Sequence, residues 1–300
     1  MKDYTKIIEA LGKEKVKENE PMKLHTNMKV GGPADLFIEV KTNEELKKAV
    51  LGAIKEKIPY TIIGNGANVL VSDQGVAGLV ILNESSQIRF ISDEIVEADS
   101  GVDLSALIKL TREKDLAGME REVKVPGTVG GAVYMNAGDT GKKEFFGDLV
   151  ESVEIIDKEG NAKTLSNEEC EFAYRSSRFQ KSGEVIVKAK LKLQKTDPKF
   201  IEEKTRNILE RKINHPAGAT VGSTFKNPDY DGAGRLIEAC GLKNKKIGGA
   251  KISEKHANFI INEGNAKAVD VKALIDLMKK SVKEKFGIDL QEEVRYIGRW

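Results

Sequence analysis

Two glycine-rich segments of this chain have the composition of a phosphate-binding loop. The first, Gly64 to Asn68, directly follows a short apolar run, and glycine at a strand end lets consecutive backbone N–H groups approach a phosphate. The second, Pro126 to Gly138, has the spacing G-x-x-G-G rather than the G-x-G-x-x-G of a Rossmann turn, and the sequence has no G-x-x-x-x-G-K-[ST] loop. Together they indicate one extended ligand such as a dinucleotide, although two ordinary glycine-rich turns would give the same pattern.

Charged and hydroxyl side chains form three further groups. Arg175 and Arg178, flanked by aromatic residues, could bind a carboxylate or phosphate bidentately, or could be two surface arginines. Ser223 follows a glycine but lies in no G-x-S-x-G elbow, which argues against a hydrolase nucleophile. Lys226 lies three residues further on, and Glu293 by itself is only part of a charged strand edge.

The histidines and cysteines do not indicate a metal site. His25, His215 and His256 are far apart and lack the spacing of metal ligands, so no metal is expected. Cys170 and Cys240 are equally isolated, and we expect both thiols to be reduced core residues.

Composition places the chain among globular proteins of two or three lobes. Its 300 residues are 40% hydrophobic and 32% charged, and the net charge of +2 gives no reason to expect nucleic acid or an anionic membrane as a partner. The charged start has no apolar region typical of a signal peptide, and no apolar run is long enough to span a bilayer. A cytoplasmic location is therefore expected.

Hydrophobic periodicity and capping residues predict that helices and strands alternate along most of the chain. The expected helices are 7–11, 46–57, 104–113, 198–213, 234–240 and 271–286, and the expected strands are 36–40, 60–63, 69–71, 79–82, 150–156, 162–165 and 185–193. A capping box at Thr42–Glu45 begins the second helix, and one apolar stripe is expected on the last, formed by Val271, Leu274, Ile275, Met278, Val282 and Phe286. No regular element is expected for 126–141, because small residues and glycine dominate it.

Seven segments, in order over almost the whole chain, resemble the UDP-N-acetylenolpyruvoylglucosamine reductases, also called UDP-N-acetylmuramate dehydrogenases. They are His25–Asn27 with Val30–Asp35, Gly64–Val71, Pro126–Gly138, Tyr174–Phe179, Gly222–Pro228, Ile247–Ala250 through Ser253–Phe259, and Glu293–Arg295 with Ile297-Gly298. One such motif is weak, but seven collinear motifs are highly specific.

The resemblance implies an α+β protein with an FAD-binding fold of the vanillyl-alcohol-oxidase type. Two α/β subdomains, 1–84 and 85–196, would bind FAD, and 197–300 would form an α+β substrate-binding domain whose C-terminal segment returns to the active site. The implied FAD contacts are Gly64, Asn65, Gly66, Ala67, Asn68, Val69, Pro126, Gly127, Thr128, Gly130, Gly131, Asn136, Ala137, Gly138 and Arg178. The implied substrate contacts are Tyr174, Lys226, Asn227 and His256.

The implied reaction is reduction of UDP-N-acetylglucosamine enolpyruvate to UDP-N-acetylmuramate for peptidoglycan synthesis, with NADPH as the reducing co-substrate. Hydride passes from flavin N5 to the vinyl carbon, and the family's catalytic positions fall on Arg175, Ser223 and Glu293. Arg175 would stabilise the developing enolate, Glu293 would help to polarise the same group, and Ser223 would protonate the α-carbon as general acid.

Several residues depart from the family's usual pattern without touching the three catalytic positions. Ala67 replaces a common serine in the first glycine-rich loop, and Arg121 stands where an apolar residue is usual. Lys124 replaces a common glycine before the second loop, and Asn214 replaces a common lysine.

Two other functions share parts of this pattern. Another FAD oxidase or dehydrogenase of the same fold would explain both glycine-rich loops, but not Gly222–Pro228 or Glu293. A nucleotide-sugar binding protein without redox chemistry would explain Lys226 and Asn227, but would give no joint role to the three catalytic positions. We expect small molecules as the only partners, and a monomer, since no long exposed apolar stripe is evident.

Overall fold

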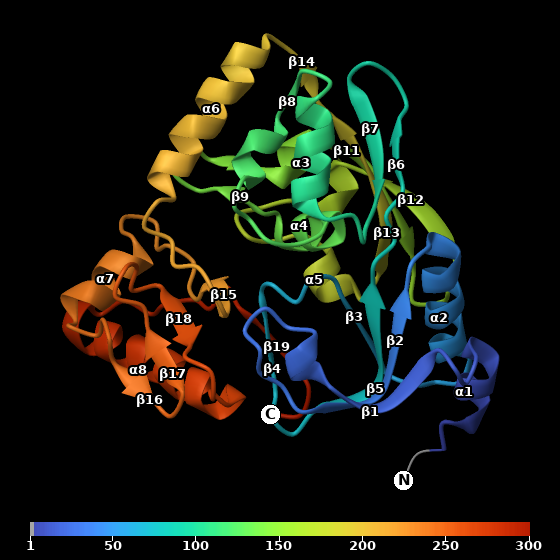
Figure 1. The fold of residues 1–300 in the computed structure, drawn as a ribbon, viewed down its shortest axis with the longest axis horizontal. Helices are drawn as coiled ribbons and strands as arrows, with labels where there is room; N and C mark the ends of the chain where they lie inside the picture. The colour runs from blue at the N-terminus through green and yellow to red at the C-terminus, as the bar shows by residue number, and fades with distance from the viewer. Residues whose placement is uncertain (1–2) are drawn as a thin grey trace. The chain divides into compact units, whose positions relative to one another are not determined.

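In a computed structural model that describes residues 3–300, the chain forms two compact units (Figure 1). Unit 1 contains the segment up to Lys17, Phe37–Asn65 and Leu79–Ile213, and unit 2 contains Glu18–Leu36, Gly66–Gly78 and Asn214–Trp300. Each unit is thus assembled from three separate stretches of sequence. The three consecutive domains expected from the sequence stay a prediction.

Unit 1 is built around a five-stranded sheet with the strand order β12-β11-β13-β7-β6. Its strands are β6 (Ile88–Phe90), β7 (Ile95–Asp99), β11 (Val150–Ile156), β12 (Ala162–Ser166) and β13 (Val185–Lys192), and all neighbours are antiparallel. Residues of β13 alternate between buried and partly exposed, so every second side chain enters the core.

Helices α3 (Leu104–Arg112) and α4 (Val129–Met135) lie on the same face of this sheet (Figure 1). Leu107 and Val133 of these helices belong to one buried cluster with Val153 and Ala189 of the strands. This core holds both helices against the sheet, and capping residues mark where they begin. Asp103 caps α3 by accepting hydrogen bonds from the N–H groups of Ser105 and Ala106.

The remaining elements of unit 1 are mostly short. They are α1 (Thr5–Leu11), α2 (Asn43–Lys55), β3 (Tyr60–Ile63), β8 (Leu116–Ala117), η2 (Met119–Glu122), β9 (Gly138–Asp139), β10 (Glu144–Phe145), η3 (Phe146–Leu149), η4 (Glu168–Cys170), α5 (Phe179–Ser182), β14 (Gln194–Lys195) and α6 (Pro198–Arg211). A further sheet has the order β1-β2-β5-β3 and includes β1 (Val16–Pro21), β2 (Pro33–Val40) and β5 (Val76–Asn83), with β3 parallel to β5.

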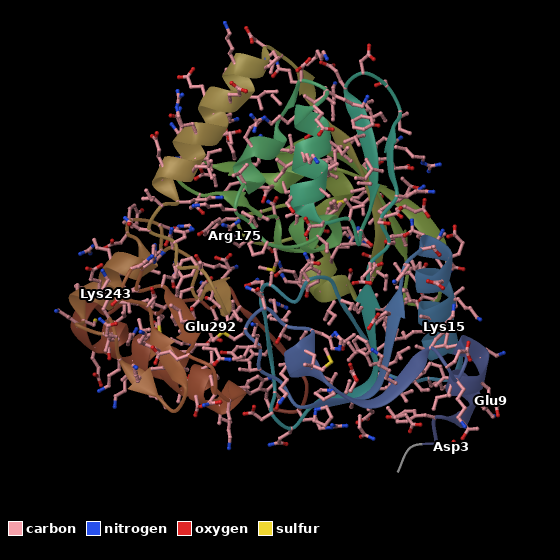
Figure 2. The ribbon with its side chains drawn as sticks, in the orientation of Figure 1. Asp3, Glu9, Lys15, Arg175, Lys243 and Glu292 are labelled. Carbon is pink, nitrogen blue, oxygen red and sulfur yellow. The ribbon has the colours of Figure 1, made fainter. Side chains whose placement is uncertain are left out.

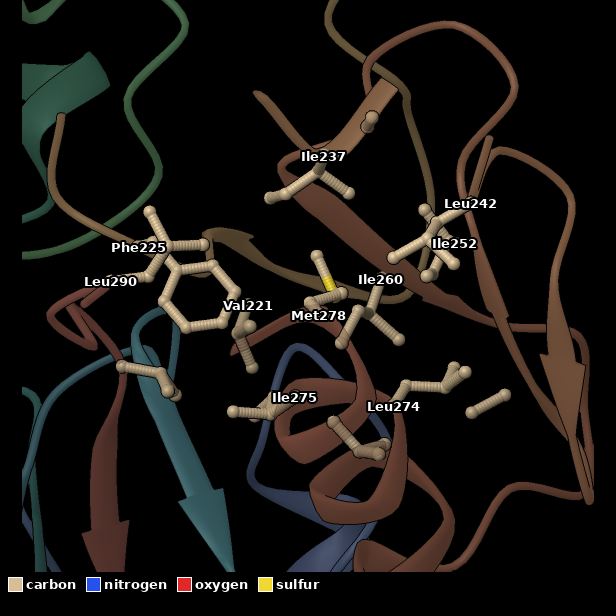
Figure 3. Packing of buried hydrophobic residues seen from close by; sticks show 14 of the residues in the cluster. Val221, Phe225, Ile237, Leu242, Ile252, Ile260, Leu274, Ile275, Met278 and Leu290 are labelled. Carbon is tan, nitrogen blue, oxygen red and sulfur yellow. The ribbon is translucent and has the colours of Figure 1, made fainter. Parts of the chain in front are cut away.

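Unit 2 packs helix α8 (Ala268–Phe286) against a four-stranded antiparallel sheet with the order β15-β18-β17-β16. Figure 3 shows Leu274, Ile275 and Met278 of α8 near Ile252 and Ile260 of the strands. The apolar stripe expected on this helix is therefore confirmed. The other elements are η1 (Met22–Leu24), β4 (Val69–Val71), β15 (Thr220–Ser223), α7 (Ala233–Ala239), β16 (Lys246–Ile247), β17 (Ala250–Ile252), β18 (Phe259–Asn262) and β19 (Arg295–Ile297).

The expectation that 126–141 contains no regular element was wrong. Val129–Met135 forms α4, and the Thr128 hydroxyl caps it by accepting a hydrogen bond from the Gly131 N–H at 3.3 Å. The glycines made the segment look irregular, because glycine disfavours helices. Gly130 is nevertheless needed for packing, since a Cβ there would lie 2.8 Å from the Cβ of Ser100. The segment also includes β9.

Within residues 3–300, no helix has both the length and the apolar character needed to cross a membrane. The same residues contain no group of three or more His, Cys, Asp or Glu side chains placed to hold a metal ion.

Candidate active site

The two glycine-rich segments meet in unit 1, at the end of β3 and the start of α4. A Cβ on Gly64 would lie 2.5 Å from Oγ1 of Thr128, so only glycine allows this approach. Asn65 donates a hydrogen bond from Nδ2 to Oδ2 of Asp103 at 2.8 Å, and Asp103 forms an isolated bridge with Thr128. The sequence-based inference that both segments serve one place is thus supported by their contact.

The first glycine-rich loop has backbone donors that suit the diphosphate of a flavin nucleotide. Across the described residues 3–300, no hydrogen bond is found from the backbone N–H groups of residues 65–68. At Gly127 the space that a Cβ would occupy is open, with only Leu104 Cδ1 nearby, at 3.9 Å. Backbone N–H groups bind phosphate oxygens without any side chain, so Ala67 in place of serine does not remove the chemistry.

The end of the first glycine-rich loop supports the segment that carries Glu293. Gly66 has φ 60° and a Cβ there would lie 2.3 Å from the carbonyl oxygen of His25, which requires glycine. Asn68 Nδ2 donates to the carbonyl oxygen of Glu293 at 3.1 Å, and the Arg295 N–H donates to the carbonyl oxygen of Asn68 at 3.0 Å. Val69 pairs with Arg295 where β4 and β19 run parallel.

Ser223 and Glu293, far apart in sequence, lie on adjacent segments of unit 2. The Glu293 N–H donates to the carbonyl oxygen of Thr224 at 2.8 Å, and the Lys226 N–H donates to that of Gln291 at 2.9 Å. Phe225, 1% exposed, anchors this pairing in the core. The backbone therefore pairs the segment that carries Ser223 and Lys226 with the segment that carries Glu293. Gly222 before Ser223 has φ 76°, with no atom near the place of a Cβ.

The predicted substrate contacts of unit 2 are placed by α7 and β18. Asn227 Oδ1 accepts a hydrogen bond from the Ala233 N–H, which starts α7, at 3.1 Å. His256 lies against Gly234, where a Cβ would be 2.6 Å from Cε1 of the ring, and its ring is 5.0 Å from that of Phe259. Burial lowers the pKa of His256, which favours the neutral imidazole.

Arg175, which Figure 2 labels, is held in unit 1 by the predicted cofactor segment. Its Nη2 donates to the carbonyl oxygen of Gly138 at 3.0 Å, and its Nη1 lies 3.5 Å from that of Asn136. The side-chain amide of Asn136 in turn donates to the Ala173 carbonyl and accepts from the Gly147 N–H, both at 2.8 Å. Arg175 has φ 52°, a left-handed conformation that is unfavourable for a non-glycine residue.

Tyr174 and Arg178 flank this arginine. The Tyr174 ring lies 5.9 Å from the Phe145 ring and 5.9 Å from the Arg175 guanidinium carbon. Arg178 pairs with both carboxylate oxygens of Glu184 at 3.0 Å, and it donates to the carbonyl oxygen of Glu169 at 2.9 Å. These bonds give Arg178 a structural role, and its contact with FAD stays a prediction. The contacts of Pro126 and Ala137 with FAD also stay predictions. The Ala137 N–H donates to the carbonyl oxygen of Ala132.

A buried charge cluster near Arg175 was missed by the sequence analysis. Glu122 is 0% exposed, and burial raises its pKa to about 7 against the opposing charges of Lys212, Arg175 and Arg121. Lys212 donates from Nζ to the carbonyl oxygens of Val123 at 2.7 Å and Arg121 at 3.4 Å, and burial lowers its pKa. The only sequence signal was the unusual Arg121 beside Glu122.

Three comparisons with known proteins agree with this architecture. Residues 34–166 match the family model of an FAD binding domain. An alkyldihydroxyacetonephosphate synthase structure, 16% identical and covering 65% of this chain and 41% of its own, superposes with a TM-score of 0.50 and shows a shared fold. The fold and the glycine-rich site therefore define a flavin-binding protein.

The C-terminal part identifies the family within this class. Residues 211–297 match the model of the UDP-N-acetylenolpyruvoylglucosamine reductase C-terminal domain. The chain is 42% identical to the UDP-N-acetylenolpyruvoylglucosamine reductase of Clostridioides difficile, over 98% of this chain and 97% of that one. It is 43% identical to that of Anoxybacillus flavithermus, over 95% of each chain. The structure of the Thermus caldophilus enzyme, 33% identical, superposes with a TM-score of 0.82 over 93% of this chain and 98% of that one. The protein belongs to the UDP-N-acetylenolpyruvoylglucosamine reductase family.

Proposed function

We propose that Arg175, Ser223 and Glu293 carry out the reduction of the enolpyruvyl group of UDP-N-acetylglucosamine enolpyruvate in this protein. As a member of its family, the protein is an FAD-dependent oxidoreductase of peptidoglycan synthesis with NADPH as the reductant. FAD, when bound, supplies hydride to the vinyl carbon of the substrate. The residues of the chain must then stabilise the negative charge and deliver a proton.

The proposed binding of FAD rests on the loop at the end of β3 and on the start of α4. The backbone N–H groups of residues 65–68 would donate to the diphosphate, and the open Cβ position of Gly127 would leave room for the cofactor at the start of α4. Gly64 and Gly130 let the chain pack closely at this place, and Gly131 belongs to the same proposed contact. The remaining predicted contacts to FAD belong to the same proposal.

The proposed chemistry divides between charge stabilisation and proton transfer. Arg175 presents a fixed positive charge to the enolate, and the left-handed backbone and two carbonyl acceptors hold its guanidinium in place. Glu293 would polarise the same group, most effectively when protonated. Ser223 would donate its hydroxyl proton to the α-carbon, with the basicity of the enolate providing much of the driving force.

The observation that carries this proposal is the pairing of residues 224–226 with 291–293. It brings Ser223 and Glu293 onto neighbouring segments although 69 residues separate them in the sequence. Neither an oxidase nor a nucleotide-sugar binding protein would give a joint role to Ser223 and Glu293 on these paired segments. Lys226 and Asn227, on the same segment, would bind the diphosphate and polar groups of the nucleotide sugar, with Tyr174 and His256 as further contacts.

Small molecules are the partners that family membership implies. We further propose that the protein works as a monomer in the cytoplasm. The near balance of 49 basic and 47 acidic residues and the two free cysteines, Cys170 and Cys240, support this proposal.

Anaerobic stopped-flow spectroscopy of the purified flavoprotein tests the function. NADPH should bleach the flavin absorbance, and addition of UDP-N-acetylglucosamine enolpyruvate should restore it rapidly. Bleaching that reverses only when air is admitted would indicate an oxidase and would contradict the proposal. A purified protein without flavin colour, even after incubation with FAD, would contradict it as well.

A further inference from the structure

The carboxyl group of Glu122 is buried in the interior of unit 1. Glu122 ends the 3-10 turn η2 and is 0% exposed, and neither of its carboxylate oxygens has a hydrogen-bond partner among the described residues. Buried polar groups are nearly always hydrogen-bonded, because desolvation is costly otherwise. Groups that break this rule are concentrated at functional sites.

Charged groups face Glu122 from four parts of unit 1. Arg121 lies on the same turn and is bound to Asp148 at 2.8 Å and to the carbonyl oxygen of Phe145 at 2.7 Å. Lys212 follows α6 and is bound to the carbonyl oxygens on both sides of Glu122. Asp139, in β9, pairs with Arg211 at 2.5 Å. Arg175, on the loop before α5, donates to the carbonyl oxygen of Gly138 at 3.0 Å, next to Asp139 in β9, and its positive charge acts on Glu122.

Of these charged groups, Arg175 alone has a proposed catalytic role. Arg121 and Lys212 bind backbone carbonyls and so fix the turn that carries Glu122. A change in the charge of Glu122 would affect the reaction through Arg175. An ionised carboxylate beside the arginine would offset part of its positive charge. A protonated carboxyl would leave that charge whole.

We propose that Glu122 is a positioning residue that controls, through its protonation, how strongly Arg175 stabilises the enolate. This inference rests on the proposed function, in which Arg175 acts on the substrate. With Glu122 protonated, Arg175 exerts its full positive charge on the enolate. With Glu122 ionised, a negative charge in the same low-dielectric region opposes enolate formation and slows the step.

Both protonation states are accessible near neutral pH. Burial raises the pKa of Glu122 to about 7, and the pKa of Lys212, which lies near it, is lowered by burial. Asp139 also favours protonation of Glu122, while the three cations oppose it. The oxidation of reduced flavin by the enolpyruvyl substrate should therefore slow as pH rises through about 7.

The test compares the wild type with Glu122→Gln in the stopped-flow assay, between about pH 5.5 and pH 8.5. The variant keeps the volume of the side chain but cannot ionise. It should lose the inflection near neutrality and keep the low-pH rate of the wild type, so that at about pH 8 it oxidises flavin roughly three- to tenfold faster than the wild type. Bleaching by NADPH should change little.

Glu120→Gln is the matched control. Glu120 lies on the same turn, is 3% exposed and accepts hydrogen bonds from the Gly118 N–H at 2.9 and 3.2 Å. Loss of the Glu120 carboxylate should lower the stability of the protein. The pH profile of flavin oxidation should stay that of the wild type. If Glu122→Gln does not fold, Glu122→Met, which is also neutral and similar in size, replaces it.

The outcomes separate this inference from the proposed function. A wild-type inflection that survives in Glu122→Gln, or an equal effect on both half-reactions, would overturn the role of Glu122. A wild type whose reduced flavin is not oxidised at all by the enolpyruvyl sugar would instead overturn the proposed function. Loss of the inflection in Glu120→Gln as well would assign it to the general fold of the turn and would also count against Glu122.

Discussion

At the scale of single residues, unfavourable local features are concentrated around Arg175. The arginine itself has φ 52°, and Glu122, which interacts with it, is buried without a hydrogen bond among the described residues. Each feature lowers stability by about 1–3 kcal/mol in typical cases. Their occurrence together is easiest to explain if catalysis requires the Arg175 guanidinium in a fixed place, next to a carboxyl group that can gain or lose a proton.

Ser223→Ala should separate the two half-reactions. If Ser223 is the general acid, the variant should oxidise reduced flavin with the enolpyruvyl substrate roughly 10²–10⁴ times more slowly, while NADPH still reduces the flavin at nearly the wild-type rate. Stopped-flow traces of both steps measure this directly. Equal losses in the two steps would show that Ser223 shapes the pocket and does not transfer the proton.

Glu122→Gln should also change stability in a pH-dependent way. A carboxyl whose pKa is 4.5 in the unfolded chain and about 7 in the fold binds its proton more tightly when folded. The stability it contributes is therefore complete below about pH 4.5 and is lost as pH rises through about 7. At pH 8 the variant should be the more stable protein by up to about 3 kcal/mol.

Urea denaturation at two pH values measures this difference. The difference in unfolding free energy between wild type and variant should shrink toward zero as the pH is lowered to about 5. A variant that is less stable than the wild type at pH 8 would show that the carboxylate has stabilising partners in the fold, contrary to the structure.

At the scale of secondary structure elements, the turn before α4 carries a residue in an unfavourable conformation. Lys124 has φ 60°, where a side chain is disfavoured and glycine is not. Lys124→Gly should raise the free energy of unfolding by about 0.5–1 kcal/mol. Lys124→Ala is the control, because alanine has the same Cβ and should bring no gain. Chemical denaturation of the three proteins checks the prediction, and equal stability of both variants would contradict it.

Capped, periodic elements could be predicted from the sequence. The Thr42 hydroxyl accepts from the Glu45 N–H at 3.2 Å, as expected for the start of α2, and Asp103 caps α3. The strand 60–63 was predicted with the bounds that β3 has. These elements follow local rules that a single sequence displays. Helix α4 could not be recognised in this way, because Gly130 is required by its close approach to Ser100, which lies elsewhere in the chain.

The site could be predicted only in part, for a similar reason. Glycine-rich loops and an arginine pair are visible in the sequence, and the resemblance to a family assigned the roles of Arg175, Ser223 and Glu293. Spacing alone could not show that residues 224–226 pair with 291–293, since this contact depends on the tertiary fold. The residues of the Glu122 cluster come from η2, β9, the loop before α5 and the end of α6. Because these segments are far apart in the sequence, no local pattern predicts the cluster.

At the scale of the whole molecule, burial of hydrophobic residues supplies most of the stability, and two of the cores that they form are clearly defined. One core packs α8 against the sheet of unit 2, and the other packs α3 and α4 against the sheet of unit 1. Many of the ion pairs, such as Lys109 with Glu113, lie on exposed side chains and contribute at most about 1 kcal/mol each. Stability should therefore depend little on salt and strongly on core packing.

The path of the chain predicts that the two units unfold together. The chain passes from one unit to the other after Lys17, Leu36, Asn65, Gly78 and Ile213, so neither unit is a single continuous segment. Loss of structure in one unit releases the ends of segments that belong to the other. We therefore expect one cooperative transition, although each unit has a core of its own.

Two fluorescent probes measure this cooperativity during a thermal scan. Trp300, the single tryptophan, lies in unit 2 with its ring 5.0 Å from that of Tyr296, and its emission should report the unfolding of that unit. Flavin emission should rise when FAD leaves its proposed site, which includes Gly64 and Thr128 of unit 1. With excess FAD present, both midpoints should increase and should stay within about 2 °C of each other, because a ligand that binds only the folded protein stabilises every part that unfolds with it. If added FAD raises the flavin midpoint and leaves the Trp300 midpoint unchanged, the units unfold independently, and the discontinuous path of the chain does not couple them.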